Sequence, residues 1–154
     1  KDPSMKAAIG HAIFSLFKSD NKYSREYKNT DIDREKPSKV DWLSGAAIFL
    51  SRKALDNAGM WDERFFMYCE DIDLCNTFRK NAYDCVYVPA AKIVHEGGVS
   101  TKQTPLKYLY LHHKSLYLFA SKKYRDNPFL KFAALIFIGV RLPFAIIKSK
   151  IPID

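Results

Sequence analysis

The segment at residues 65–75 reads Phe-Phe-Met-Tyr-Cys-Glu-Asp-Ile-Asp-Leu-Cys and holds three carboxylates within four residues, directly after an aromatic run. An apolar-periodic stretch follows and ends in two basic residues. Acids in the first turn and bases in the last turn suit the dipole of a helix. We therefore predict a helix over residues 69–82 whose first turn carries Glu70, Asp71 and Asp73.

The three acids have two interpretations. An acid near a helix start is most often there for the helix itself, because it interacts favourably with the positive end of the dipole. Carboxylates beside aromatic side chains are also the groups that general-base chemistry uses. Here the acids outnumber what a cap requires, and we expect Phe65, Phe66 and Tyr68 to desolvate them. On the residues alone, both interpretations stay open.

Short strands and helices are expected along the rest of the chain, which places it in the α/β class (α+β if it is a fragment). The predicted elements are a buried strand at 45–50, a helix at 51–59 capped by Ser51 and ended by Gly59, a strand at 85–88, an extended piece at 92–95, and helices at 105–124 and 129–147. We expect three parts: an irregular polar segment at 1–39, a central part at 40–100 and a basic helical part at 101–154.

Size and composition indicate a globular protein. The chain has 154 residues, of which 47% are hydrophobic, enough for one domain with a core. Its three cysteines match no zinc-binding spacing, and we expect free thiols in a reducing cytosol. The first residues lack an apolar core segment, so we expect no signal peptide.

The positive charge is concentrated in the last third of the chain. Residues 1–100 carry 15 Lys+Arg and 15 Asp+Glu, whereas residues 101–154 carry 10 Lys+Arg and 2 Asp+Glu. Such asymmetry suggests an anionic partner: a membrane surface, a diphosphate-bearing substrate or nucleic acid. Nucleic acid is disfavoured, because the basic residues are mixed with a strongly apolar helix rather than placed on a polar face with stacking aromatics.

The most apolar segment, residues 129–147, resembles a membrane span at first sight. Only nine residues separate Lys131 from Arg141, whereas a span needs about 20 apolar residues, so we reject a transmembrane helix. Two interpretations remain open. The segment packs on a core, or it lies in the plane of an anionic membrane surface with basic residues at its ends. Those basic residues are Lys122, Lys123, Arg125, Lys148 and Lys150.

A single histidine, His95, ends the extended piece and precedes Glu-Gly-Gly-Val-Ser. A lone histidine is more often structural than a ligand. At a strand end beside a flexible turn it can coordinate a metal ion if other ligands converge on it.

Several motifs together resemble a known family. They are Trp-Leu-Ser-Gly-Ala-Ala at 42–47, Gly-Met-Trp-Asp-Glu-Arg at 59–64, the acid-headed segment at 65–75, and His-Glu-Gly-Gly-Val-Ser at 95–100. In this order, from about residue 40 to 125, they resemble the C-terminal half of bacterial family 2 glycosyltransferases of the rhamnosyltransferase-like kind. The resemblance implies a partial GT-A fold with a short mixed sheet, flanking helices and a helical C-terminal region.

The resemblance also implies roles for individual residues. Asp71 matches the general base of an inverting mechanism, taking the proton from an acceptor hydroxyl that attacks the anomeric carbon of a nucleotide-sugar. Glu70 would hold the acceptor or orient the base, and Asp73 would contact the sugar or complete the helix start. The aromatic residues placed at the acceptor are Trp61, Phe66 and Tyr68. The acceptor itself would be a glycan or a lipid-linked sugar, as in the synthesis of bacterial cell-surface polysaccharides.

His95 matches the family's downstream metal-site histidine, which implies a divalent ion, Mg or Mn, in the complete enzyme. The nucleotide-binding half that such enzymes carry first, ending in an Asp-x-Asp motif, is missing. The Asp-x-Asp at residues 31–33 follows no strand, and the one at 71–73 is the base motif itself. We therefore expect a fragment that is inactive alone, from a cytoplasmic enzyme at the inner face of the membrane. The alternative is a non-catalytic module that binds a membrane surface or a protein partner.

Overall fold

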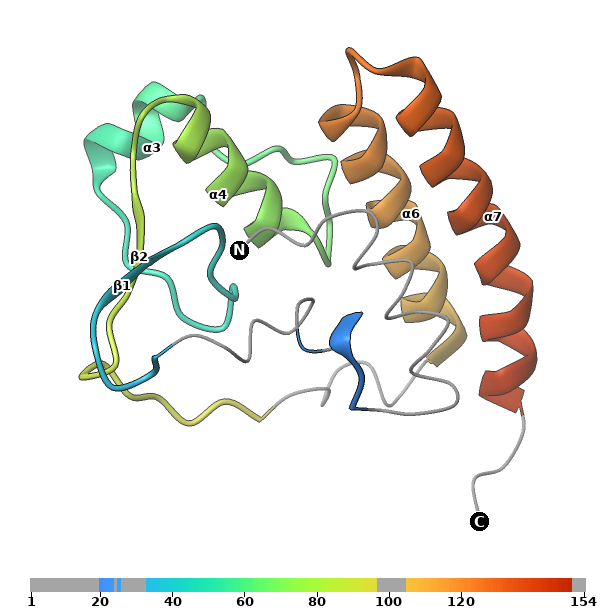
Figure 1. The fold of residues 1–154 in the computed structure, drawn as a ribbon, viewed down its shortest axis with the longest axis horizontal. Helices are drawn as coiled ribbons and strands as arrows, with labels where there is room; N and C mark the ends of the chain where they lie inside the picture. Colours follow the sequence, from blue (N-terminus) through green and yellow to red (C-terminus); the bar gives the residue numbers. More distant parts are fainter. Residues whose placement is uncertain (1–19, 24, 26–32, 97–104, 151–154) are drawn as a thin grey trace. The chain divides into compact units, whose positions relative to one another are not determined.

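The computed structural model describes residues 20–23, 25, 33–96 and 105–150 and combines α-helices with a small β-sheet (Figure 1). The elements are β1 (Ser38–Val40), α3 (Arg52–Ala58), α4 (Glu70–Lys80), β2 (Cys85–Tyr87), α6 (Pro105–Lys123) and α7 (Pro128–Lys150). The mixed α and β class is as predicted. Within the described residues the sheet has two strands that pair antiparallel, so the expected mixed sheet is wrong.

The chain divides into two compact units. The first, which we call the sheet unit, comprises Lys1–Met60 and Leu74–Ile93. The second, which we call the helical unit, comprises Trp61–Asp73 and Val94–Asp154. Helix α4 begins in the helical unit and continues in the sheet unit, so the acidic first turn belongs to the helical unit.

The sheet unit has a small core between its two helices. Ala54 of α3 packs with Leu74 and Phe78 of α4, and Tyr83 packs against this cluster. Strands β1 and β2 pair with Lys39 opposite Val86. The strand predicted at 85–88 is confirmed, whereas β1 begins within the segment that we expected to be irregular.

Helix α3 is confirmed as predicted, with both of its caps. The Ser51 hydroxyl accepts a hydrogen bond from the Ala54 amide at 3.4 Å. Gly59 adopts a left-handed conformation with φ 82°, and its amide donates to the Asp56 carbonyl. That conformation is sterically unfavourable for a residue with a Cβ, which is why glycine so often follows the last turn of a helix.

The strand predicted at residues 45–50 is wrong. This segment forms no strand, and Phe49 is fully exposed while Ile48 and Leu50 are half-buried. An apolar run becomes a strand only where a neighbouring strand can pair with its backbone, and in the described part of the chain only β1 and β2 pair. The segment instead lines an apolar cleft of about 910 Å³ within the sheet unit. The extended piece predicted at 92–95 likewise forms no strand.

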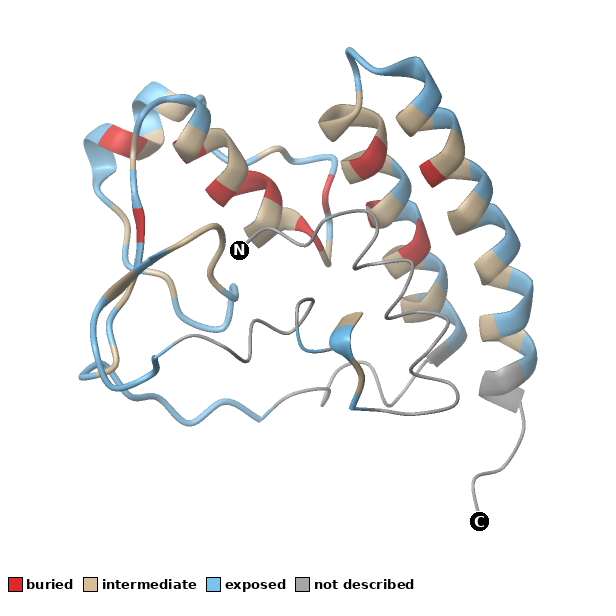
Figure 2. Cartoon of the chain, in the orientation of Figure 1, coloured by how far each residue is buried: buried red, intermediate tan, exposed pale blue. Residues whose placement is uncertain are grey.

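The helical unit is built on a hairpin of α6 and α7, both of which were predicted (Figure 1). Asn127 starts α7: its side-chain oxygen accepts from the Leu130 amide at 3.0 Å, and Pro128 follows at the first helical position. Figure 2 shows buried positions along α6, whereas α7 is largely half-buried or exposed. Ala134 is a buried residue of α7.

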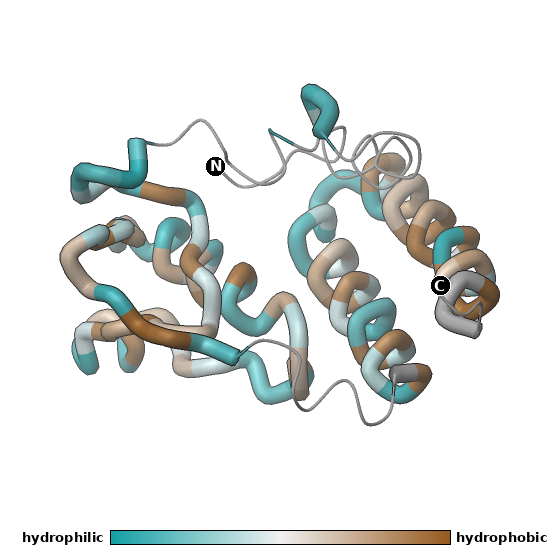
Figure 3. The backbone as a smooth tube through the Cα atoms, turned by 90° about the horizontal axis from the view of Figure 1, so that it is seen from below, coloured by the Kyte–Doolittle hydropathy of each residue, from teal (hydrophilic) through white to brown (hydrophobic). Residues whose placement is uncertain are grey.

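Helix α7 forms one long apolar helix, although the charged residues Lys131 and Arg141 lie within its sequence. Residues Pro128–Ile147 make a 20-residue apolar stretch that is long enough to cross a membrane by length and composition alone, and 6% of it is buried. Figure 3 shows its hydrophobic character along the hairpin. The two charges on which we rejected a span therefore do not interrupt the helix.

Candidate functional site

The acidic first turn of α4 follows two backbone positions of unusual geometry. Tyr68 and Cys69 have φ angles of 68° and 63°, in the left-handed region. For residues with a side chain this conformation costs roughly 1–2 kcal/mol each and persists only where the surroundings hold it. Strain of this kind is concentrated at functional sites. Its position directly before three acids therefore marks the start of α4 as a candidate site.

Glu70 and Asp71 are half-buried at the start of the helix. Burial raises the pKa of Glu70, and the neighbouring charge of Asp71 adds to this rise. The Oε2 atom of Glu70 is shielded from solvent and has no hydrogen-bond partner among the described residues. A shielded acceptor without a donor is costly, and such an atom is commonly satisfied by a ligand or an ordered water. Asp71 Oδ1 accepts from the Ile72 amide at 2.8 Å.

Asp73 lies in a different environment from the other two acids. It is 3% exposed, and its Oδ2 lies 2.6 Å from Lys122 Nζ of α6. Residues two apart in a helix point about 200° apart around its axis, so Asp71 and Asp73 cannot face the same side. The Asp73 carboxylate is therefore shielded from solvent and paired within the protein.

Lys122 joins the helix start to the preceding loop. Its Nζ also lies 3.0 Å from Asp62 Oδ2, and Asp62 in turn pairs with Arg64 at 2.6 Å. Burial alone lowers the pKa of Lys122, but the hydrogen bonds that it donates to Asp73 and Asp62 outweigh this effect, and its pKa is raised. The Arg64 hydrogen bond, helped by Lys122 and opposed by burial, holds the pKa of Asp62 well below its usual range. Lys122 is thus engaged within the protein, and it does not serve the interpretation in which it would meet an anionic membrane surface.

Two further residues of α6 hold the loop at 61–69. Ser115 is buried, and its hydroxyl donates to the Met67 carbonyl at 2.6 Å. The His112 ring meets the Tyr68 ring edge to face, with centroids 5.1 Å apart. Both contacts adjoin the two left-handed residues. The middle of helix α6 therefore supports the strained turn.

Helix α7 braces α6 through a buried histidine. His113 Nδ1 lies 2.8 Å from the Leu109 carbonyl, and its Nε2 lies 3.2 Å from Arg141 Nη1. A carbonyl only accepts and a guanidinium only donates, so we assign the proton to Nδ1 and leave Nε2 to accept. Burial lowers the pKa of His113, in agreement with this neutral form.

The burial of the His112 ring makes the stability of the protein depend on pH. Burial, then Arg141 and His113, lower its pKa from 6.5 to about 4. Between these values the unfolded chain binds more protons than the folded one, so stability falls as pH falls through this window. We expect a loss of up to about 3 kcal/mol from this residue, with a smaller contribution of the same sign from His113.

The measurement is thermal unfolding of the full-length protein from pH 7 to pH 4. In His112→Phe the unfolding temperature should fall less steeply with decreasing pH. The control His95→Gln, at an exposed position, should show the same dependence as the unmodified protein. An unchanged pH dependence of the unfolding temperature in His112→Phe would show that His112 is not its source.

The aromatic residues expected at an acceptor differ in exposure. Trp61 is 38% exposed and Phe66 is 77% exposed, so both present ring surface to solvent. Tyr68 is half-buried, and burial raises the pKa of its hydroxyl. Phe65 is buried. The expectation that all three aromatic residues at 65–68 desolvate the acids is wrong for Phe66, because its ring is turned to solvent.

The described residues do not form a metal site around His95. This side chain is exposed, and no group of three or more His, Cys, Asp or Glu that could hold a metal ion occurs in the described ranges. Of the first Asp-x-Asp string, Asp31 lies outside the described residues, and Asp33 is exposed and accepts from the Glu35 amide. Any further ligands would have to come from residues other than these.

The cysteines are free, as predicted, and all three are buried. Cys69, at the strained turn, has its pKa raised to about 12, mainly by burial and further by the nearby acids. It is therefore a poor nucleophile.

Three residues of this site were not identified from the sequence: His112, Ser115 and Lys122. Lys122 stands beside Lys123 in a basic helix end, and the pattern gives no reason to separate them. The contacts that distinguish these residues span 44 to 60 positions of the chain. Such pairings depend on the fold and leave no local pattern.

Comparison with known proteins confirms the resemblance to rhamnosyltransferases. The chain is 36% identical over 123 residues to an N-acetylglucosaminyl-diphospho-decaprenol L-rhamnosyltransferase of Mycobacterium tuberculosis, which covers 79% of this chain and 39% of that protein. It is 30% identical over 84 residues to the rhamnosyltransferase WbbL of Escherichia coli, covering 54% of this chain and 32% of that protein. The chain thus spans about two-fifths of the length of the first of these relatives. No family model and no solved structure matches it.

Proposed function

We propose that this chain is the acceptor-binding and catalytic-base part of an inverting glycosyltransferase of family 2 with a GT-A fold. The observation that carries the proposal is the first turn of α4. A strained backbone places two half-buried carboxylates side by side, and Glu70 has a shielded oxygen without a donor. The similarity to rhamnosyltransferases supports glycosyl transfer as the reaction.

In the proposed reaction, Asp71 accepts the proton of an acceptor hydroxyl while its oxygen attacks the anomeric carbon of a nucleotide-sugar. The bond from that carbon to the diphosphate breaks, and the nucleotide leaves with the bonding electrons. Glu70 accepts a hydrogen bond from the acceptor and so positions it. The exposed faces of Trp61 and Phe66 offer ring surfaces for the sugar, while Tyr68 supports the turn.

The acceptor proposed is a sugar on a lipid diphosphate, by analogy with the name of the mycobacterial relative, and the donor is a nucleotide-activated hexose such as L-rhamnose. Such an enzyme would work in the cytoplasm, at the inner face of the membrane. A divalent ion, Mg or Mn, is part of the proposal for the complete enzyme. This chain offers His95 toward it, and the described residues supply no further ligand set, so no step is derived through the ion.

The test is a transfer assay with the full-length protein that contains these residues. It uses a panel of nucleotide-hexoses and a polyprenyl-diphosphate-linked N-acetylglucosamine acceptor. Product formation with inverted anomeric configuration, read by nuclear magnetic resonance, is the expected result. Absence of transfer from every donor, or retention of configuration, would contradict the proposal.

A prediction for Glu70 separates acceptor binding from donor binding. Glu70→Gln keeps the side-chain size but weakens the acceptor of the hydrogen bond. We expect the KM for the acceptor to rise about tenfold, while the dissociation constant of the nucleotide stays unchanged. Steady-state kinetics and calorimetry measure the two quantities. An equal loss of nucleotide affinity would place Glu70 at the donor instead.

A further inference from the structure

The outward face of α7 carries a continuous apolar stripe. Its members are the exposed side chains Phe129, Phe132, Ile136, Val140, Phe144 and Ile147. Their spacing of three or four residues places them within an arc of about 120° on a helix of 3.6 residues per turn. Over this length the helix rises about 27 Å. We call these six residues the α7 stripe.

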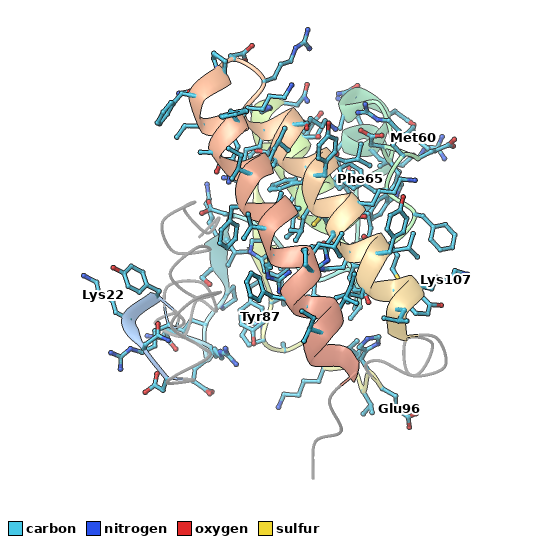
Figure 4. The ribbon with its side chains drawn as sticks, turned by 90° about the vertical axis from the view of Figure 1, so that its right-hand side faces the viewer. Lys22, Met60, Phe65, Tyr87, Glu96 and Lys107 are labelled. Atoms are coloured by element: carbon cyan, nitrogen blue, oxygen red, sulfur yellow. The ribbon has the colours of Figure 1, made fainter. Side chains whose placement is uncertain are left out.

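The two charged residues of α7 between Phe129 and Ile147 are Lys131 and Arg141, and both lie away from the stripe. Arg141 is turned toward α6, where it meets His113, and buried Ala134 marks the same inner side. By helical spacing Lys131 lies about 160° from the centre of the stripe. Between Phe129 and Ile147 the stripe is therefore free of charge. Figure 4, which faces this side of the hairpin, shows side chains projecting along α7 with α6 beside it.

We propose that the α7 stripe docks in the plane of an anionic lipid surface. A face of six large apolar side chains without a charge suits the boundary between headgroups and acyl chains. The surrounding sequence supplies the matching charge, since residues 101–154 carry all of the excess positive charge of the chain. Arg125, exposed in the turn just before α7, is one cation placed to meet anionic headgroups.

Contacts within the helical unit favour an in-plane position over a span. Helix α6 packs on the inner face of α7 and carries exposed Lys107 and Lys114. It also holds the acid-bearing loop through Ser115 and Lys122. If α7 crossed the bilayer with α6 attached, these charges would enter hydrocarbon at a cost of about 3 kcal/mol each. Docking along the stripe leaves all of these contacts intact.

The proposal is independent of the catalytic chemistry, although it would bring the proposed site to a lipid-linked acceptor. The test uses the full-length protein and vesicles of phosphatidylcholine with or without phosphatidylglycerol. We expect binding to the anionic vesicles that weakens with salt, and much weaker binding to the neutral ones. The double variant Phe132→Asp/Phe144→Asp should bind about tenfold less or weaker still.

Two controls match this variant. Val88→Asp/Ile93→Asp places the same charges on exposed apolar residues of the sheet unit and should bind like the unmodified protein. Phe132→Leu/Phe144→Leu keeps the stripe apolar and should also bind. Circular dichroism of each variant checks that the helices form. Equal vesicle binding by the double Asp variant would overturn the proposal.

Three other measurements can also overturn or support it. Resistance to alkaline carbonate extraction would show a span, and release supports docking. Self-association without lipid that the double Asp variant abolishes would assign the stripe to a second copy. Transfer to a water-soluble acceptor should survive in the double Asp variant. Absence of transfer in the unmodified protein and in all variants would count against the proposed function. It would not affect the conclusion from vesicle binding.

Discussion

Asp71→Asn in the full-length protein is expected to lower the rate of glycosyl transfer by about 10³-fold while nucleotide binding stays unchanged. The amide has the size of the carboxylate, and its oxygen can still accept from the Ile72 amide at the helix start. It cannot take up the proton of the acceptor hydroxyl. General-base catalysis contributes about 10²–10⁴-fold, which sets the scale of the loss. Single-turnover transfer and nucleotide titration measure the two effects.

A neighbouring acid provides the matched control. Glu63 lies in the loop before α4 and is exposed, so Glu63→Gln removes one negative charge without touching the first turn of the helix. It should transfer at close to the normal rate. Near-normal transfer by Asp71→Asn would show that another group takes the proton. Loss of nucleotide binding in the same variant would show a structural role for Asp71.

The elements that were predicted correctly are those with local causes. Ser51 and Gly59 mark the ends of α3 because a hydroxyl cap and a left-handed glycine act within one turn. The acidic start of α4 follows from the dipole in the same way. Asn127 and Pro128 likewise define the start of α7. In each case the side chain and the backbone group that it satisfies are near neighbours in the sequence.

The predictions that failed depended on partners elsewhere in the chain. The apolar run at 45–50 has the composition of a strand, but its backbone finds no pairing strand in the described part of the chain, and Phe49 stays exposed. The left-handed geometry of Tyr68 and Cys69 also has no local cause, since neither residue type favours it. Contacts with α6 are what hold that turn.

The candidate site also has some features with local causes and others that depend on distant residues. The sequence placed three acids in one turn, but it could not decide which of them faces a substrate. The structure shows that Lys122, 49 residues from Asp73, pairs with this one carboxylate in the protein interior. Because positions two apart lie on opposite sides of a helix, pairing Asp73 inward turns Asp71 outward. The structural interpretation therefore applies to Asp73, and the proposed chemical role is left to Asp71 and Glu70.

Replacing Lys122 should consequently destabilise the first turn of α4. Lys122→Met keeps the aliphatic stem but leaves the buried Asp73 and the partly buried Asp62 without their shared cation. Removing one partner of a buried ion pair costs about 3–5 kcal/mol, and because Lys122 is itself one-third exposed we expect roughly 2–3 kcal/mol. Amide hydrogen exchange in the full-length protein measures the stability of this turn residue by residue. Exchange at residues 71–73 should accelerate by about 30- to 150-fold.

The adjacent lysine and a second substitution make this prediction specific. Lys123 lies over the rings of Phe119 and Tyr124, so Lys123→Met should change exchange at the helix start little. Adding Asp73→Asn to Lys122→Met removes the stranded charge and should recover part of the protection, because the penalty comes from an unpaired buried carboxylate. Transfer should fall in Lys122→Met through a weakened turn, with the pH profile of the remaining activity unchanged. A shifted profile would instead show that Lys122 sets the proton affinity of the base, and equal exchange in both lysine variants would show that the ion pairs do not hold the turn.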